Sequence, residues 1–378
     1  MSFFGSARAA LRNRQCLRWT IAAFAVVLTG LSISCGSSSS PKSASHNAYV
    51  TLPQTGSVGL LSINNSTGAI TVGSKTPPVQ GNSPTGLALH SSKKFLFVAN
   101  SAANTISVFN VASDGTLTLG GAPTAAGSGP RGMVLDPSGQ YLLVTNTVSN
   151  NISVFSVDSG SGALSQVGSP VYANNGPTEI LITPSGKFVY VTNPSIGFIT
   201  GFTFAAGVLS PVPGSPFASG AGVSAVAVES GEHFLYAANT TANTISGFVI
   251  DSTTGALTTV PGSPFSSTAG SGPSAMSMDT ANKFLYVTTP GSSDSIWAFT
   301  WDSTTGTLTP ASNSPFNLLS AGSLFLIMEP SGSFFYIGNQ SASNIAGFQY
   351  SSGNATPTAV TNSPFSIGSP PGKMVISH

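Results

Sequence analysis

Charged side chains are scarce in this chain, and three of them fall where a polar ligand could bind. Only 6% of the 378 residues are charged. Arg131, Glu179 and Lys373 each stand at the start of a short apolar run, where similar runs carry Thr, Ser, Gly or Ala. Arginine offers a two-pronged fork to a carboxylate or phosphate, and a nearby Glu or Lys can act as acid, base or electrostatic stabiliser. These three residues are our candidate ligand-binding site, with no catalytic residue assigned.

The same residues also allow a structural interpretation. Arg131 and Glu179 could form an ion pair between neighbouring repeats, leaving Lys373 as a solvated residue near the end of the chain. Ion pairs are a common reason for isolated charges in folded proteins. The sequence leaves both interpretations open.

Other residue types give no pattern typical of metal or covalent chemistry. The histidines are His46, His90, His233 and His378, which we place in an N-terminal tether, two turns and the C-terminus. No two stand at ligand spacing, so we predict no metal site and no cofactor. The chain also has no Gly-x-Ser-x-Gly segment and no phosphate-binding glycine loop ahead of a helix.

The segments that carry the candidate residues belong to a unit that recurs at a fixed period. A strand-like run ends near residues 52, 100, 146, 193, 239, 289 and 339, at intervals of 46–50 residues. Typical copies are Phe95–Asn100 and Phe188–Asn193. This period suits one four-stranded propeller blade. The 42 Gly and 26 Pro also argue against long helices and favour an all-β fold.

Two further markers recur with the same period. A turn glycine, expected in the left-handed conformation, appears at Gly68, Gly115, Gly162, Gly207, Gly255, Gly306 and Gly353. Ser-Pro-Phe segments such as 215–217 and 263–265 recur near the predicted outer strand, where proline removes no needed hydrogen bond. The counts of strand runs and of turn glycines both predict seven blades.

A small-to-apolar run such as Arg131–Leu135 begins each unit, and its lack of alternation predicts an innermost strand covered on both faces. The last copy, near Lys373, closes the chain, whereas the first unit has none ahead of it. We therefore predict a seven-bladed β-propeller of four-stranded antiparallel blades. Residues 371–377 would pair with the N-terminal blade, 48–80, and close the ring.

The N-terminal segment predicts export. Four arginines in residues 8–18 precede a thirteen-residue uncharged stretch, 19–31, which is short for a membrane span. The segment resembles a bacterial lipoprotein signal in which Cys35 becomes the lipid-modified first residue, although Ser32 stands where Leu is usual. Ordinary cleavage near Ser34 is the alternative. We assign 1–34 to the signal peptide, 35–47 to a Ser-rich tether and 48–378 to the propeller.

Charge and cysteine content limit the partners. Beyond residue 34 the chain keeps eight basic and eleven acidic residues, too few cations for nucleic acid. Cys35 would be the only cysteine there, so no intramolecular disulfide is available. We expect a monomer that meets the membrane only through its lipid.

Two sets of polar residues recur once per repeat. The first ends the second strands: Asn100, Asn146, Asn193, Asn239 and Asn339. We expect these to cap the following turns, with polyol binding as the alternative. The second set ends the innermost strands, at the end opposite Arg131: His90, Asp136, Glu229, Asp279 and Glu329. We expect these to cap the turns there, which we call the lower turns.

Tyr190-Val-Thr-Asn193 resembles the repeat of YVTN-type propellers, and Gly129–Gly139 followed by Tyr141–Asn146 resembles the lactonase family of seven-bladed propellers. The resemblance spans residues 48–378 and implies a propeller fold and 6-phosphogluconolactone hydrolysis. Members of that family typically have a histidine where this chain has Gly132, and a glutamate where it has Thr147.

Two functions remain. The first is an exported, lipid-anchored propeller that serves as a binding or interaction module at the cell envelope, taking a protein or a small polar, anionic ligand at the channel mouth. The alternative is a lactone hydrolase that uses Arg131 to hold an anionic substrate. Periplasmic or secreted release without a lipid is the alternative location.

Overall fold

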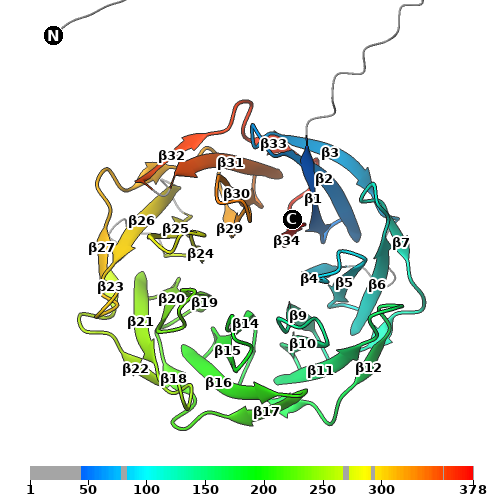
Figure 1. The fold of residues 1–378 in the computed structure, drawn as a ribbon, viewed down its shortest axis with the longest axis horizontal. Helices are drawn as coiled ribbons and strands as arrows, with labels where there is room; N and C mark the ends of the chain where they lie inside the picture. The colour runs from blue at the N-terminus through cyan, green and yellow to red at the C-terminus, as the bar shows by residue number, and fades with distance from the viewer. Residues whose placement is uncertain (1–43, 78–82, 267–271, 291–293, 352, 378) are drawn as a thin grey trace, which may run out of the picture. The chain divides into compact units, whose positions relative to one another are not determined.

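Seven antiparallel sheets stand side by side in a ring (Figure 1). The computed structural model describes residues 44–77, 83–266, 272–290, 294–351 and 353–377, and all regular structure within these ranges is β-strand. Ser43–His378 form one compact unit. The predicted seven-bladed, all-β fold is confirmed. The predicted signal peptide 1–34, Cys35 and His378 lie outside the described residues, and no helix long and apolar enough to span a membrane occurs within them.

Each blade is ordered from the channel outward. The innermost strands are β4 (Pro84–Leu89), β9 (Pro130–Leu135), β14 (Ile180–Ile182), β19 (Val223–Val228), β24 (Ala275–Met278) and β29 (Ser323–Met328). The second strands are β5 (Phe95–Asn100), β10 (Tyr141–Asn146), β15 (Phe188–Asn193), β20 (Phe234–Asn239), β25 (Phe284–Thr289) and β30 (Phe334–Asn339). The third strands are β6 (Thr105–Val111), β11 (Asn151–Val157), β16 (Phe198–Ala205), β21 (Thr244–Ile250), β26 (Ser295–Trp301) and β31 (Asn344–Ser351). We number these blades 1 to 6 in this order.

The outer edge of each of these blades is made of two short pieces that pair with different halves of the third strand. The first pieces are β7 (Leu117–Leu119), β12 (Leu164–Gln166), β17 (Val208–Pro211), β22 (Leu257–Thr259), β27 (Leu308–Pro310) and β32 (Asn354–Ala359). The second pieces are β8 (Thr124–Ala125), β13 (Val171–Tyr172), β18 (Phe217–Ala218), β23 (Phe265–Ser266), β28 (Phe316–Asn317) and β33 (Phe365–Ser366). The Ser-Pro-Phe segments lie where the chain enters the second piece, as predicted. There Ser215 Oγ accepts a 2.9 Å hydrogen bond from the Gly201 N–H of the third strand.

Blade 7 joins the two ends of the chain. It consists of β34 (Met374–Ile376), β1 (Ser45–Leu52), β2 (Ser57–Asn64) and β3 (Ile70–Lys75). β34 pairs antiparallel with β1, with Ala48 opposite Ile376 and Val50 opposite Met374. The predicted ring closure is confirmed. β1 begins at Ser45, so residues 45–47 belong to a strand rather than to the tether. His46 therefore lies in β1, with its Nε2 3.3 Å from Glu329 Oε1.

The innermost strands are less covered than predicted. They mix buried and half-buried positions, as in β9, where Gly132 is buried and Met133 and Val134 are half-buried. Both faces of these strands pack against neighbouring blades, as in β14, where Ile180 packs toward blade 2 and Leu181 toward blade 4. The edge of the strand that borders the channel keeps some exposure, which accounts for the difference. The second strands carry the continuous burial instead, since every residue of β5, β15, β20, β25 and β30 is buried.

A hydrogen bond from a buried tyrosine hydroxyl connects each of five blades to the next. A tyrosine of a second strand donates a hydrogen bond to a carbonyl at the outer turn of the following blade. The five bonds are Tyr49 to Gly115 (3.0 Å), Tyr190 to Gly255 (2.8 Å), Tyr236 to Gly306 (2.8 Å), Tyr286 to Ala355 (3.0 Å) and Tyr336 to Gly68 (2.8 Å). Burial raises the pKa of all five hydroxyls, that of Tyr49 to about 12. Blades 1 and 2 have Phe97 and Leu143 at this position and lack the bond.

The turn glycine is required for two reasons. Six of the seven predicted turn glycines have φ between 69° and 88°; the seventh, Gly353, follows residue 352, which lies outside the described residues. A Cβ added to Gly255 would also lie 2.4 Å from the ring of Phe188, two residues before Tyr190. The second-strand run and the turn glycine thus form one contact between blades.

The turn-capping role predicted for the recurring asparagines is wrong. Asn100, Asn146, Asn193, Asn239 and Asn339 are fully buried, so they cannot bind a polyol in this structure. They crosslink strands instead of capping turns: Asn146 Nδ2 donates to Asn151 Oδ1 (2.8 Å) and Ser153 Oγ (2.9 Å) of the third strand. The side chain points into the blade because it sits inside the second strand, one residue before the turn.

The lower turns are capped as predicted. Asp136 Oδ1 accepts the Tyr141 N–H at 2.7 Å, and Asp279 Oδ1 accepts the Phe284 N–H at 2.8 Å. His90 Nε2 lies 3.1 Å from the carbonyl oxygen of Gly139 in the next blade. These groups stabilise turns at the end of the ring opposite Arg131.

Candidate functional site

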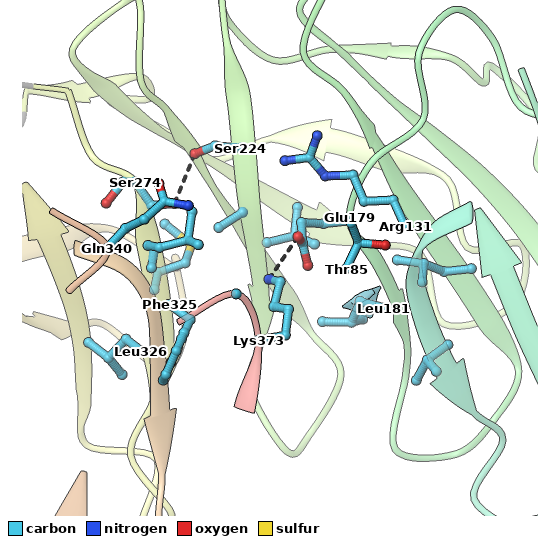
Figure 2. Close-up of a pocket in the computed structure, with 18 of the residues that line it drawn as sticks. Thr85, Arg131, Glu179, Leu181, Ser224, Ser274, Phe325, Leu326, Gln340 and Lys373 are labelled. Atoms are coloured by element: carbon cyan, nitrogen blue, oxygen red, sulfur yellow. Dashed lines mark hydrogen bonds and ion pairs between the residues drawn. The ribbon is translucent and has the colours of Figure 1, made fainter. Parts of the chain in front are cut away.

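A cavity of about 750 Å³ opens where the innermost strands begin, at the end of the channel that we call the mouth. Arg131, Glu179 and Lys373 all line it, and Figure 2 shows them close to one another. The sequence therefore located three residues of a single cavity, although they come from blades 2, 3 and 7. Their function is not decided by this placement.

β-bulges direct side chains into this cavity. The pairing of inner and second strands slips at the same place in blades 1, 2, 4 and 6. Residues within the slip are Thr85, Arg131, Ser224 and Leu324, and all four line the cavity. A bulge leaves a residue unpaired and re-aims its side chain. The sequence pattern placed Arg131 at the strand start but did not reveal the bulge.

Arg131 is exposed at the mouth while its backbone is tightly held. Thr85 Oγ1 of blade 1 donates a 2.8 Å hydrogen bond to the carbonyl oxygen of Pro130, just before it. Within the described part of the chain, no acidic group lies at ion-pair distance from the guanidinium. A charged, preformed donor fork is therefore directed at the cavity with no protein anion to neutralise it.

Glu179 is paired with Lys373 and not with Arg131. Lys373 Nζ lies 2.7 Å from Glu179 Oε1, and the side chains are 33% and 24% exposed. This corrects both parts of the structural interpretation, because the expected Arg131–Glu179 pair does not form and Lys373 is not simply solvated. The reason is the ring closure, which brings the last innermost strand opposite blade 3. The pair spans the channel and leaves one net positive charge, on Arg131, among these three residues.

Gly132 and Thr147 stand where the lactonase resemblance implies a histidine and a glutamate. The backbone leaves no space for a larger side chain at Gly132, and the Thr147 hydroxyl is already hydrogen-bonded. A Cβ on Gly132 would lie 2.2 Å from the Thr178 carbonyl oxygen, so a histidine cannot be built on this backbone. Thr147 Oγ1 donates a 2.8 Å hydrogen bond to the Pro177 carbonyl oxygen. Both positions serve contacts between blades 2 and 3.

Gln340 is a cavity residue that the sequence pattern did not indicate. It follows Asn339 at the end of β30 and lines the cavity from blade 6. The same position holds Ser101, Thr147, Pro194 or Thr240 in other repeats. The sequence could have indicated Gln340 only through its long amide side chain, because the other repeats named here carry smaller residues at this position.

No three His, Cys, Asp or Glu side chains gather into a metal-binding group within the described ranges. The polar side chains that line the mouth within the described ranges are the Arg131 guanidinium, the Glu179–Lys373 pair, the Gln340 amide and the hydroxyls of Thr85, Ser224 and Ser274.

Comparison with known families agrees with this architecture. The family model for lactonase, 7-bladed β-propeller, matches residues 41–176, 171–260 and 205–319. The chain belongs to this lactonase family. No curated protein sequence matches it.

Solved structures resemble this lactonase-family propeller over nearly their whole length. A Bacteroides fragilis protein provisionally named as a 6-phosphogluconolactonase has 18% identity and a TM-score of 0.77, over 90% of this chain and 99% of that one. The periplasmic gluconolactonase of Pseudomonas aeruginosa has 16% identity and a TM-score of 0.74, over 89% and 99%. A Lactobacillus plantarum protein has 16% identity and a TM-score of 0.75, over 89% and 100%. At these identities the likeness establishes the fold alone.

Proposed function

We propose that this lactonase-family propeller is a binding module of the cell envelope that takes a small anionic ligand at the mouth. The observation that supports this most directly is the exposed Arg131, which faces the cavity and has no anionic partner in the described structure. A guanidinium binds carboxylate or phosphate by charge-assisted hydrogen bonds. Loops on a rigid scaffold are the usual place for such recognition.

The second candidate is a lactone hydrolase, which family membership and the named neighbours favour. Hydrolysis needs a positioned acid or base, which typically contributes a factor of about 10²–10⁴. At this mouth the only described carboxylate lining the cavity is Glu179, and it is held by Lys373. Arg131 alone can bind an anion, but equal binding of ground and transition states does not accelerate a reaction.

The binding proposal can be tested with trifluoroacetate, a compact carboxylate observed by fluorine NMR. Residues 36–378 should broaden its signal, and Arg131→Ala should lower the affinity about 10-fold or more because a charge-assisted bond is lost. Arg131→Lys should retain part of the binding. Lys94→Ala, at a lower turn, is the matched control and should change nothing. Binding that survives Arg131→Ala would contradict the proposal.

The hydrolase candidate is tested on the same proteins with 6-phosphogluconolactone. We expect residues 36–378 to hydrolyse it no faster than an unrelated propeller. A rate well above that background that disappears in Arg131→Ala would favour the hydrolase instead.

A further inference from the structure

The cavity at the mouth has two chemically different walls. Arg131, Glu179 and Lys373 supply charge from blades 2, 3 and 7. Deeper along β14 and across the channel, the lining is apolar; it comprises Ile180, Leu181, Ile182, Val226, Met276, Leu324, Phe325 and Leu326. Figure 2 shows Phe325 and Leu326 on the side of the cavity away from Arg131. A ligand that fills the space would meet charge at one end and hydrocarbon at the other.

Some of this apolar wall is exposed to the channel. Leu181, Val226 and Leu324 are half-buried and line the cavity, and Leu181 and Val226 also pack against the hydrophobic cluster between blades 3 and 4. Covering such surface gains about 25 cal/mol per Å². An apolar ligand body would therefore be bound by the wall, in addition to the charge at Arg131.

The hydroxyl groups around the cavity are already used by the protein. Thr85 Oγ1 donates to the Pro130 carbonyl oxygen at 2.8 Å. Ser224 Oγ donates to the Ser274 carbonyl oxygen at 3.1 Å, and Ser274 Oγ to that of Ser323 at 3.2 Å. A polyhydroxylated ligand needs several free partners here, because a hydroxyl that is buried without a hydrogen-bond partner weakens binding. Gln340 is the one amide side chain among the described residues that line the cavity, and a single amide does not satisfy a sugar acid.

We infer that the ligand is an amphipathic anion, a carboxylate joined to an alkyl or aromatic body, rather than a sugar acid. The inference rests on the proposed binding function and specifies its ligand class. The carboxylate binds Arg131, and the body extends along Leu181 and Val226 toward Phe325. The Glu179–Lys373 pair lies beside this path and keeps its own charges balanced.

Octanoate and gluconate form a matched pair for the test, because both are monocarboxylates and differ in whether the body is alkyl or polyhydroxylated. We expect residues 36–378 to bind octanoate at least 10-fold more tightly by calorimetry. Each buried methylene contributes about 0.8 kcal/mol, which is roughly fourfold in affinity, so two buried methylenes suffice. Arg131→Ala should weaken binding of octanoate.

Two wall variants extend the test. Leu181→Thr should weaken octanoate binding about 10-fold and leave any gluconate binding unchanged. Val226→Thr, which keeps the side-chain shape, should act in the same direction by a few-fold and covers the case in which Leu181→Thr does not fold. Val208→Thr is the matched control, because Val208 is 60% exposed on outer strand β17, and it should have no effect.

The outcomes distinguish a failure of the inferred ligand class from a failure of the proposed anion-binding function. Gluconate binding that equals or exceeds octanoate binding, and that depends on Arg131, would overturn the amphipathic ligand and leave the anion-binding function standing. Octanoate binding that is insensitive to both wall variants would also overturn it. If neither compound binds, or if Arg131→Ala has no effect on either, the ligand class and the proposed function both fail.

Discussion

Gly132 shows at the scale of single residues why this mouth differs from the family pattern. Its missing side chain lets the carbonyl of Thr178, in the next blade, approach the strand that carries Arg131. The same contact recurs one blade earlier, where a Cβ on Gly86 would lie 2.1 Å from the Arg131 carbonyl oxygen. Arg131 is therefore positioned by close backbone packing on both sides, and that packing excludes a neighbouring histidine.

Gly132→Ala should destabilise the protein by about 1–3 kcal/mol, because a methyl group is forced against backbone that cannot rotate away. Urea unfolding measures the change. Gly160→Ala is the matched control, since a Cβ there meets only Asp158 Oδ1 at 3.5 Å. Equal stability of the two variants would show that the blades shift freely and that a larger residue fits at Gly132.

The buried tyrosine hydroxyls give a second prediction at this scale. Tyr236→Phe should cost about 1–3 kcal/mol of unfolding free energy, because the buried Gly306 carbonyl loses its donor. Tyr172→Phe, at a residue that is 63% exposed, should stay within about 0.5 kcal/mol of the wild type. Denaturant titration of both variants decides whether the bond between blades contributes to stability.

The buried tyrosine hydroxyls also predict how the unfolding free energy changes at alkaline pH. Burial, and then the charge of Asp114, raises the pKa of Tyr49 from 10.0 to about 12. Above pH 10 the unfolded chain loses this proton first, so the stability it contributes is lost as pH rises from 10 to 12. Tyr49→Phe should remove about 1 kcal/mol of the fall in unfolding free energy between pH 10 and 11. Identical pH profiles for the variant and the wild type would contradict the burial.

At the scale of elements, the three-residue strand β34 both closes the ring and sets the charge pattern of the mouth. It covers β1, buries Met374 and Ile376, and places Lys373 opposite Glu179. Without it, β1 would become an unpaired edge facing the channel. Ring closure and the charge pattern of the mouth therefore depend on one short strand.

Deleting residues 371–378 should lower the melting temperature by on the order of 10 °C. Losing two buried apolar side chains costs several kcal/mol, and a domain of this size shifts by a few degrees per kcal/mol. Removing residue 378 alone is the control and should have no effect. A truncated protein that melts within a degree or two of the full chain would disprove the closure.

At the scale of the whole molecule, the two ends of the ring have different surroundings. β1 begins at Ser45 beside the lower turns, where His46 meets Glu329, whereas Arg131 lies at the mouth. The first described strand therefore starts at the end of the ring opposite the proposed ligand site.

Cys35→Ala should release the protein from the membrane fraction of a bacterial host or halt its processing, because the sequence predicts acylation of this thiol. Fractionation followed by immunoblotting measures the distribution, with Ser37→Ala as the control that keeps the cysteine. Wild-type protein found wholly in the soluble fraction would indicate ordinary cleavage near Ser34.

Local sequence pattern is sufficient to specify the repeat, the strand order and the closing strand. These features can be predicted from short segments, because every blade must bury the same faces and turn at the same points. For this reason the residue types alone identify Phe188–Asn193 as a buried strand and Gly255 as a tight turn. The positions of Arg131, Glu179 and Lys373 at strand starts likewise follow from the repeat.

Which groups meet depends on the tertiary structure. In the closed ring Tyr190 donates a hydrogen bond to Gly255 of the next blade, and Asn146 points into its own blade. β-bulges form at the mouth. Glu179 pairs with Lys373 rather than with Arg131. Each of these contacts links segments whose separation depends on the curvature of the ring and on side-chain direction. A one-dimensional pattern specifies neither, so it locates Arg131, Glu179 and Lys373 but misses Gln340, and it does not reveal that Arg131 has no anionic partner in the described structure.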